Sequence, residues 1–99
     1  MDKTQALLMV KQRLNMMTGI TQLDDYLETR IGAAEAELGR MGIRLGSGVD
    51  DLVLLVDYVV WQYQSRDKPG GRPEWLTMRL RDRWLHDRAA TGEVAGDDP

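Results

Sequence analysis

The apolar positions of this chain recur at helical spacing, and glycine and proline divide them into four segments. The pattern predicts helices over about residues 3–17, 21–41, 51–65 and 73–88. The third segment is rich in valine and could pass for a buried strand, but its length without a breaker favours a helix. We therefore predict an all-α fold, a single domain of about four helices: two long amphipathic or apolar ones, with shorter N- and C-terminal helices.

The second segment is the most regular amphipathic helix. Thr21 is a plausible N-cap, with Asp24 three residues later as a variant of the capping box. The apolar positions share one face: Leu23, Leu27, Ile31, Ala34, Leu38 and Met41. The opposite face carries Gly32, Ala36 and Gly39. Either these small residues are simply tolerated, although each glycine costs about 1 kcal/mol of helix stability relative to alanine, or they mark a place where another backbone approaches closely.

The third segment has more apolar surface than a small protein is expected to cover. One broad stripe suits a core: Leu52, Val53, Val56, Val59, Val60 and Tyr63. On roughly the opposite side, Leu54, Tyr58 and Trp61 form a second apolar patch at helical spacing. Either a partner chain covers this patch, or the first helix folds back over it. We expect the first, and so predict that the protein assembles with other chains.

The fourth segment repeats this arrangement. Leu76, Leu80 and Trp84 lie on one side, which we expect to face the core, whereas Met78 and Leu85 fall on the far side. Together with the patch on the third segment, Met78 and Leu85 are the residues we predict at a subunit interface.

Arginines make the fourth segment locally basic: Arg79, Arg81, Arg83 and Arg88. They could contact DNA phosphates or line a DNA channel, or they could form a solvated face offset by nearby acidic residues. The chain as a whole has a net charge of −3 and a pI near 5.0. Overall charge therefore argues against a dedicated nucleic-acid-binding protein.

Composition excludes several other classes of function. The 99 residues contain no cysteine, so neither a disulfide framework nor a thiolate zinc site is available. His86 is the only histidine, and no nucleophile elbow or phosphate loop is present. We predict no enzyme activity, no metal, no cofactor, no small-molecule substrate and no membrane span, since no apolar segment reaches about 18–20 residues. Residues 90–99, ATGEVAGDDP, are expected to form a disordered acidic tail.

The pattern resembles that of the small head–tail connector proteins of tailed bacteriophages and prophages. The opening GITQLDDYLETRIGAAEAEL supplies the residues that carry the likeness: Gly19, Ile20, Thr21, Asp24 or Asp25, Leu27, Ile31 and Ala34. A hydrophobic helix then ends in an aromatic-rich turn with Tyr58, Trp61 and Tyr63. The likeness covers roughly residues 5–88, within a connector-like domain of residues 1–89. The loop at 42–49 is short for that family, and the tail has no counterpart.

The resemblance implies a structural protein of the virion, assembled in the bacterial host cytoplasm. Such a protein docks beneath the capsid portal as a homo-oligomeric ring of about twelvefold symmetry. It extends the DNA channel toward the tail, contacts portal and head- or tail-completion proteins, and touches packaged DNA non-specifically. Two other functions remain open: a small helical adaptor that binds a host partner through its second apolar patch, and a dimeric DNA-binding regulator.

Overall fold

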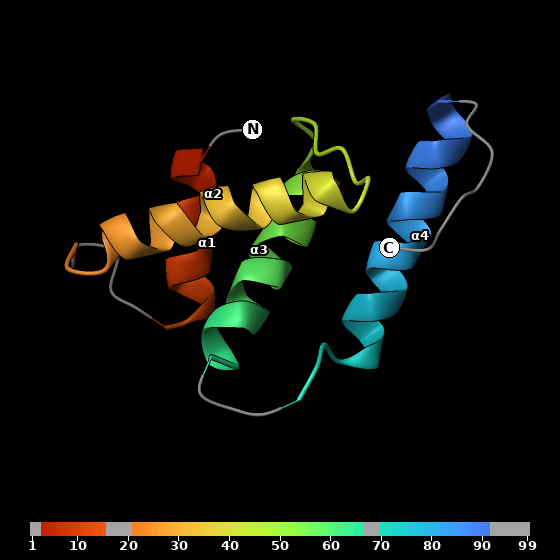
Figure 1. The fold of residues 1–99 in the computed structure, drawn as a ribbon. Helices are drawn as coiled ribbons and strands as arrows, with labels where there is room; N and C mark the ends of the chain where they lie inside the picture. Colours follow the sequence, from red (N-terminus) through yellow and green to blue (C-terminus); the bar gives the residue numbers. More distant parts are fainter. Residues whose placement is uncertain (1–2, 16–20, 67–69, 92–99) are drawn as a thin grey trace.

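The computed structural model describes residues 3–15, 21–66 and 70–91, which contain four α-helices and no strand (Figure 1). The helices are α1 (Lys3–Arg13), α2 (Asp24–Arg40), α3 (Val49–Gln64) and α4 (Glu74–Thr91). The predicted all-α fold is confirmed. Gly19 and Ile20, which carry part of the family likeness, and residues 16–17 of the first predicted helix lie outside the described residues.

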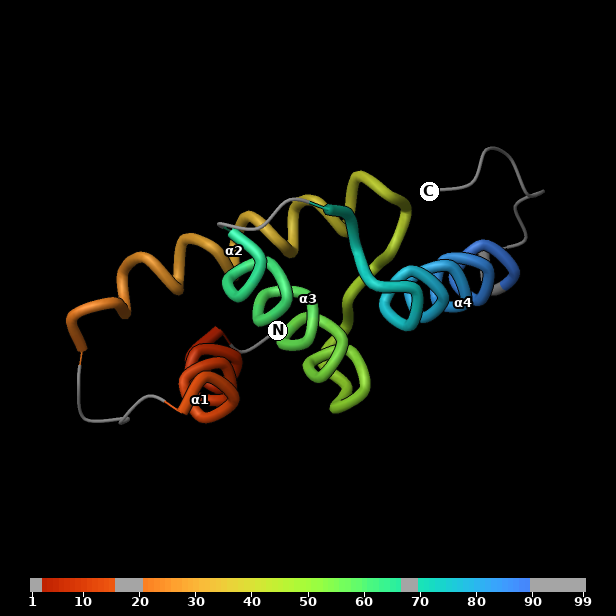
Figure 2. The backbone as a smooth tube through the Cα atoms, turned by 90° about the horizontal axis from the view of Figure 1, so that it is seen from below, coloured from red at the N-terminus to blue at the C-terminus, as the bar shows by residue number. Residues whose placement is uncertain are grey.

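Helix α3 occupies the middle of the molecule. Helices α1 and α2 contact each other, and both contact α3 on one side. Helix α4 runs alongside α3 on the other side, and its backbone stays farther away than those of α1 and α2 (Figures 1 and 2). Side chains fill this space, so α4 joins the core through long residues rather than through close backbone packing.

The hydrophobic core draws on all four helices and on Ile43 in the loop after α2. The apolar face of α2 is buried as predicted at Leu27, Ile31, Ala34 and Leu38. These side chains recur with the helical period, so one face of α2 packs on α1 and α3 along its whole length. Leu23 is an exception, because it precedes the first turn of α2 and is exposed.

The predicted cap of α2 is wrong. The helix begins at Asp24, after Leu23, and no side chain caps it. The carboxylate of Asp24 instead accepts a hydrogen bond from the ammonium of Lys11 in α1, at 2.8 Å. Lys11 is buried, and a buried ammonium needs an anionic partner. An acidic residue in the first turn also favours the helix dipole.

Helix α2 ends in a Schellman motif. The N–H of Ile43 donates to the carbonyl of Leu38 at 2.9 Å, and the N–H of Gly42 donates to that of Gly39 at 3.0 Å. Gly42 has a φ of +92°, which glycine adopts without strain. A Cβ at Gly42 would lie 2.9 Å from Nε1 of Trp84 in α4. The turn therefore needs glycine for both its conformation and its contact with α4.

Two further helix starts differ from prediction. Helix α3 begins after Gly48, two residues before its predicted start, and no side chain caps it. The carboxylate of Asp51 instead accepts a hydrogen bond from the N–H of Gly46, which holds the preceding loop against the first turn. Helix α4 begins one residue after Pro73, whose carbonyl accepts from two N–H groups of the first turn.

Helix α4 also extends beyond its predicted end. It continues to Thr91, although the acidic tail was expected to begin at residue 90. Ala89 and Ala90 precede the first glycine of the tail, and alanine has the strongest helix propensity. The rest of the expected tail, residues 92–99, lies outside the described residues.

Candidate subunit interface

The second apolar patch of α3 is covered within the chain. Leu54 and Tyr58 are each 4% exposed, and Trp61 is half-buried. The hydroxyl of Tyr58 donates to a carboxylate oxygen of Glu37 in α2, at 2.9 Å. The prediction that Leu54 and Tyr58 lie at a subunit interface is therefore wrong. The patch is instead covered within the chain, as the alternative expected, and the hydrogen-bond partner of Tyr58 comes from α2 rather than from the first helix.

Two ion pairs place α4 over Leu54. Asp51 and Asp57 lie three residues before and three residues after Leu54, so they flank it on the surface of α3. Arg83 of α4 binds Asp51, and Arg79 of α4 binds Asp57. The buried side of α4 consequently lies against the face of α3 that holds Leu54. Helix α3 is apolar all round because three helices of the same chain surround it.

Asp57 is the buried carboxylate that joins three helices. It accepts a hydrogen bond from Arg13 of α1 at 2.5 Å and a second from Arg79 of α4. Both arginines keep part of their side chains in solvent, whereas the carboxylate is buried among apolar residues. A buried carboxylate without such partners would be strongly unfavourable. The sequence pattern did not reveal this group, because Asp57 lies between two apolar faces.

Arg83 is the main polar contact between α4 and the rest of the molecule. Its guanidinium binds Asp51, the carbonyl of Arg44, and Asp87 one turn further along α4, the last at 2.8 Å. The hydrogen bond from Arg83 holds the pKa of Asp51 below its usual value, and the hydrogen bond to Asp51 in turn raises the pKa of Arg83. Both groups are thus charged at neutral pH.

These contacts change the meaning of the basic segment. The charges of Arg79 and Arg83 are balanced by carboxylates of the same chain. Pairing of Arg83 with nearby Asp87 agrees with the alternative of a face offset by acidic residues, whereas the pairs with Asp51 and Asp57 of α3 were not predicted. The guanidinium of Arg88 lies 4.8 Å from the ring centre of Trp84, where cation–π attraction holds it. Arg81 is exposed. Contact of Arg81 or Arg88 with DNA stays a prediction.

The outer face of α4 is the most apolar exposed surface on one helix. Met78 is 57% exposed and Leu85 is 46% exposed, as their predicted interface role requires. Trp75, at 51%, belongs to the same face. The opposite face supplies the core residues Leu76, Leu80 and Trp84. We call Trp75, Met78 and Leu85 the outer stripe; Trp75 lies three residues before Met78 and so shares its side of the helix.

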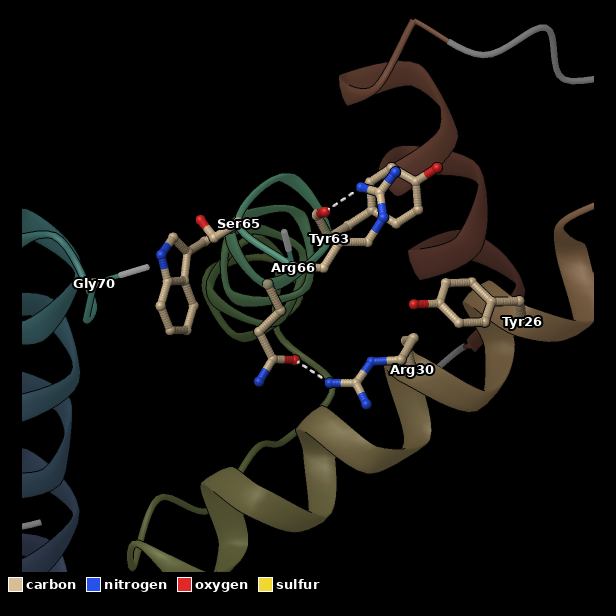
Figure 3. Close-up of a pocket in the computed structure, with 8 residues that line it drawn as sticks. Tyr26, Arg30, Tyr63, Ser65, Arg66 and Gly70 are labelled. Carbon is tan, nitrogen blue, oxygen red and sulfur yellow. Dashed lines mark hydrogen bonds between the residues drawn. The ribbon is translucent and has the colours of Figure 1, made fainter. Parts of the chain in front are cut away.

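A groove lies between α2 and the C-terminal end of α3, with a volume of about 410 Å³. Figure 3 shows Tyr26 and Arg30 on α2, facing Tyr63 and Arg66 at the end of α3. The two tyrosine rings meet edge to face, with centres 6.3 Å apart. The guanidinium of Arg66 lies 4.1 Å from the centre of the Tyr63 ring. We call this the aromatic–arginine groove.

A hydrogen-bond chain runs from the lining of the groove into the contact between α2 and α3. Arg30 donates to Gln62 at 2.7 Å, and Gln62 donates to Glu37 at 2.9 Å. Glu37 also accepts from Tyr58. Burial, followed by this hydrogen bond and the charge of Glu37, raises the pKa of Tyr58 to about 12. Tyr58 is therefore a neutral donor at physiological pH, and the network fixes α2 against α3.

The described residues include one histidine and no cysteine. Among them, no group of three or more histidine, cysteine, aspartate or glutamate residues could hold a metal ion. His86 is exposed on α4. No helix in this part of the chain has both the length and the apolar character to cross a membrane. A second hollow, between α1 and α2, mixes charges of both signs, with Lys3 facing Asp25 and Glu28.

Comparisons of this chain with known protein families, with curated proteins and with solved structures found no match.

Proposed function

We propose that this chain is a structural protein of the head–tail junction of a tailed bacteriophage or prophage. In this function, copies form a ring beneath the portal, extend the DNA channel toward the tail and catalyse no reaction. The sequence resemblance suggests the family, and the four-helix fold is consistent with it. The observation that carries the proposal is the outer stripe of α4, which is apolar and exposed. It lies on a helix whose opposite face packs on the core.

The outer stripe suits a heterologous contact, in which one surface of a subunit meets a different surface of the next. Contacts of this kind close into rings when the rotation between subunits allows it. Each of the three side chains keeps about half of its surface in solvent. Burying that surface would contribute on the order of 1 kcal/mol per residue, which favours assembly at high local concentration on a portal template.

The charge distribution suits a channel through which DNA must pass. A channel wall that bound phosphates tightly would hold the DNA back. In this chain Arg79 and Arg83 are balanced by Asp57 and Asp51, and the net charge is negative. The same balance opposes a DNA-binding regulator, because two of its four candidate arginines hold the fold together.

The proposal is tested by the mass of the purified protein over a concentration series, alone and with portal, using native mass spectrometry. We expect a ring of about a dozen subunits, formed in solution or only on the portal. Met78→Glu combined with Leu85→Glu should abolish the ring while leaving the helical circular dichroism spectrum unchanged. Leu8→Glu is the matched control, because Leu8 is also an exposed leucine but lies on α1.

A protein that stays monomeric with portal present, or a ring unaffected by the double variant, would contradict the proposal. A constant dimer that binds DNA would favour the regulator. Capture of a host protein without any portal binding would favour the adaptor.

A further inference from the structure

The aromatic–arginine groove is chemically suited to an acidic extended peptide. The described residues that line it include Arg30 and no carboxylate, together with three aromatic side chains. Arg30 reaches across the groove to the neutral amide of Gln62, so its charge is not balanced at that contact. Guanidinium groups bind carboxylates with paired, charge-assisted hydrogen bonds, and exposed rings pack against the peptide between them.

The chain itself contains a segment of this chemistry. Residues 92–99, GEVAGDDP, carry three acidic side chains and no basic one. Val94 and Ala95 lie between Glu93 and the Asp97–Asp98 pair, so small apolar groups separate the charges along the segment. The charge of the segment is thus opposite to that of Arg30.

The length of α4 decides which copy supplies the segment. The groove includes Gly70, which lies just before α4, whereas residue 92 follows the far end of that helix. The 18 residues of α4 span about 27 Å. Eight residues reach at most about 26–29 Å when fully extended. A segment bound to its own groove would have to run back straight along the whole of α4, whereas a neighbouring copy places no such demand on it.

We propose that the aromatic–arginine groove binds residues 92–99 of a second copy of this chain. This inference rests on the assembly proposed above and names a second contact within it. One subunit then offers the groove near the start of α4, and its neighbour offers the segment that follows the end of α4. Because the two surfaces differ, the contact is heterologous and propagates in one direction around a ring.

Cysteine cross-linking tests this directly, since the full chain contains no cysteine. Ser65→Cys puts one thiol at the groove, and Ala95→Cys puts the other in the acidic segment. Oxidation of the doubly substituted full-length protein should give a ladder of covalent multimers on a non-reducing gel. Adding Glu93→Gln, Asp97→Asn and Asp98→Asn should remove the ladder, as should Arg30→Glu. The matched control replaces Ser65→Cys by Gln12→Cys, an exposed position on α1, and should give no ladder.

The outcomes separate this inference from the proposed ring. A cyclised monomer, no product, or an equal ladder from the control would overturn the groove inference. Native mass spectrometry of the same samples reports on the ring independently. A ring that forms without tail cross-links would support the proposed function and contradict the groove contact. Tail-linked dimers that never close into a ring would support the groove contact and contradict the proposed function. Circular dichroism of each variant confirms that a lost ladder does not reflect unfolding.

Discussion

Helices α3 and α4 look alike in the sequence but behave differently in the structure. Both have a core face and additional apolar residues on the opposite side. In α3 those residues are buried at Leu54 and Tyr58, whereas in α4 the corresponding side chains at Met78 and Leu85 remain in solvent. The difference comes from position: α3 has neighbours on three sides and α4 has the core on one side only. An apolar face therefore indicates a partner surface only after the neighbours of the helix within its own chain are known.

The largest expected contrast is between truncations on the two helices. Leu55→Ala in α3 should lower the free energy of unfolding by about 2–5 kcal/mol, because Leu55 is fully buried and a cavity would remain. Met78→Ala in α4 should change it by less than about 0.5 kcal/mol. Urea denaturation of the two variants measures both. A loss at Met78 comparable to that at Leu55 would mean that the outer stripe is packed inside the monomer.

Replacing the buried carboxylate that joins the two helices should have the next largest effect on stability. Asp57→Ala should destabilise the protein by about 2 kcal/mol, since it leaves Arg13 and Arg79 without their partner. The partial exposure of both arginines keeps this below the value for a fully buried pair. A double-mutant cycle with Arg79→Ala isolates the contact between α3 and α4. A coupling energy of zero would show that α4 does not depend on this ion pair.

Gly42 tests the contact between α4 and the turn after α2. Gly42→Ala should destabilise the protein by about 1–2 kcal/mol, because alanine is strained at positive φ. Its methyl group would also displace the Trp84 ring, so tryptophan fluorescence should shift together with stability. Gly48→Ala is the matched control, because it has an extended backbone and open space around it. Equal effects at the two glycines would contradict the proposed contact.

The smallest expected effect is the dependence of stability on pH at Asp51. Arg83 lowers the pKa of Asp51 in the folded protein, so the contribution is present above the unfolded pKa of about 4 and is lost as pH falls through the lower folded value. At pH 7 the free energy of unfolding of the wild type should exceed that of Asp51→Asn by about 1 kcal/mol. The difference should shrink below pH 4. Thermal unfolding of both proteins between pH 2 and pH 7 measures this difference in stability. A difference that does not depend on pH would show that the ion pair is not its cause.

Much of the fold could be predicted from local pattern. The buried face of α2, at Leu27, Ile31 and Leu38, follows from the helical period alone, and the breaks at Gly42 and Pro73 follow from local backbone chemistry. Helix caps were less predictable. Asp24 was expected in a local capping role, and the structure gives it a partner distant in sequence, Lys11. A carboxylate near a helix start can bind either the N–H groups of the first turn or a cation distant in sequence, and only the folded chain brings that cation close.

The candidate interface was likewise predictable only in part. Residue spacing along one helix is enough to predict that the chain is helical, that α3 carries apolar residues on opposite sides and that Met78 and Leu85 share a face of α4. The packing of the helices on one another establishes that Asp57 and Asp51 balance Arg79 and Arg83, and that Tyr26 and Tyr63 meet beside a groove. These contacts join residues more than 20 positions apart, and their existence depends on how the helices pack rather than on any local preference.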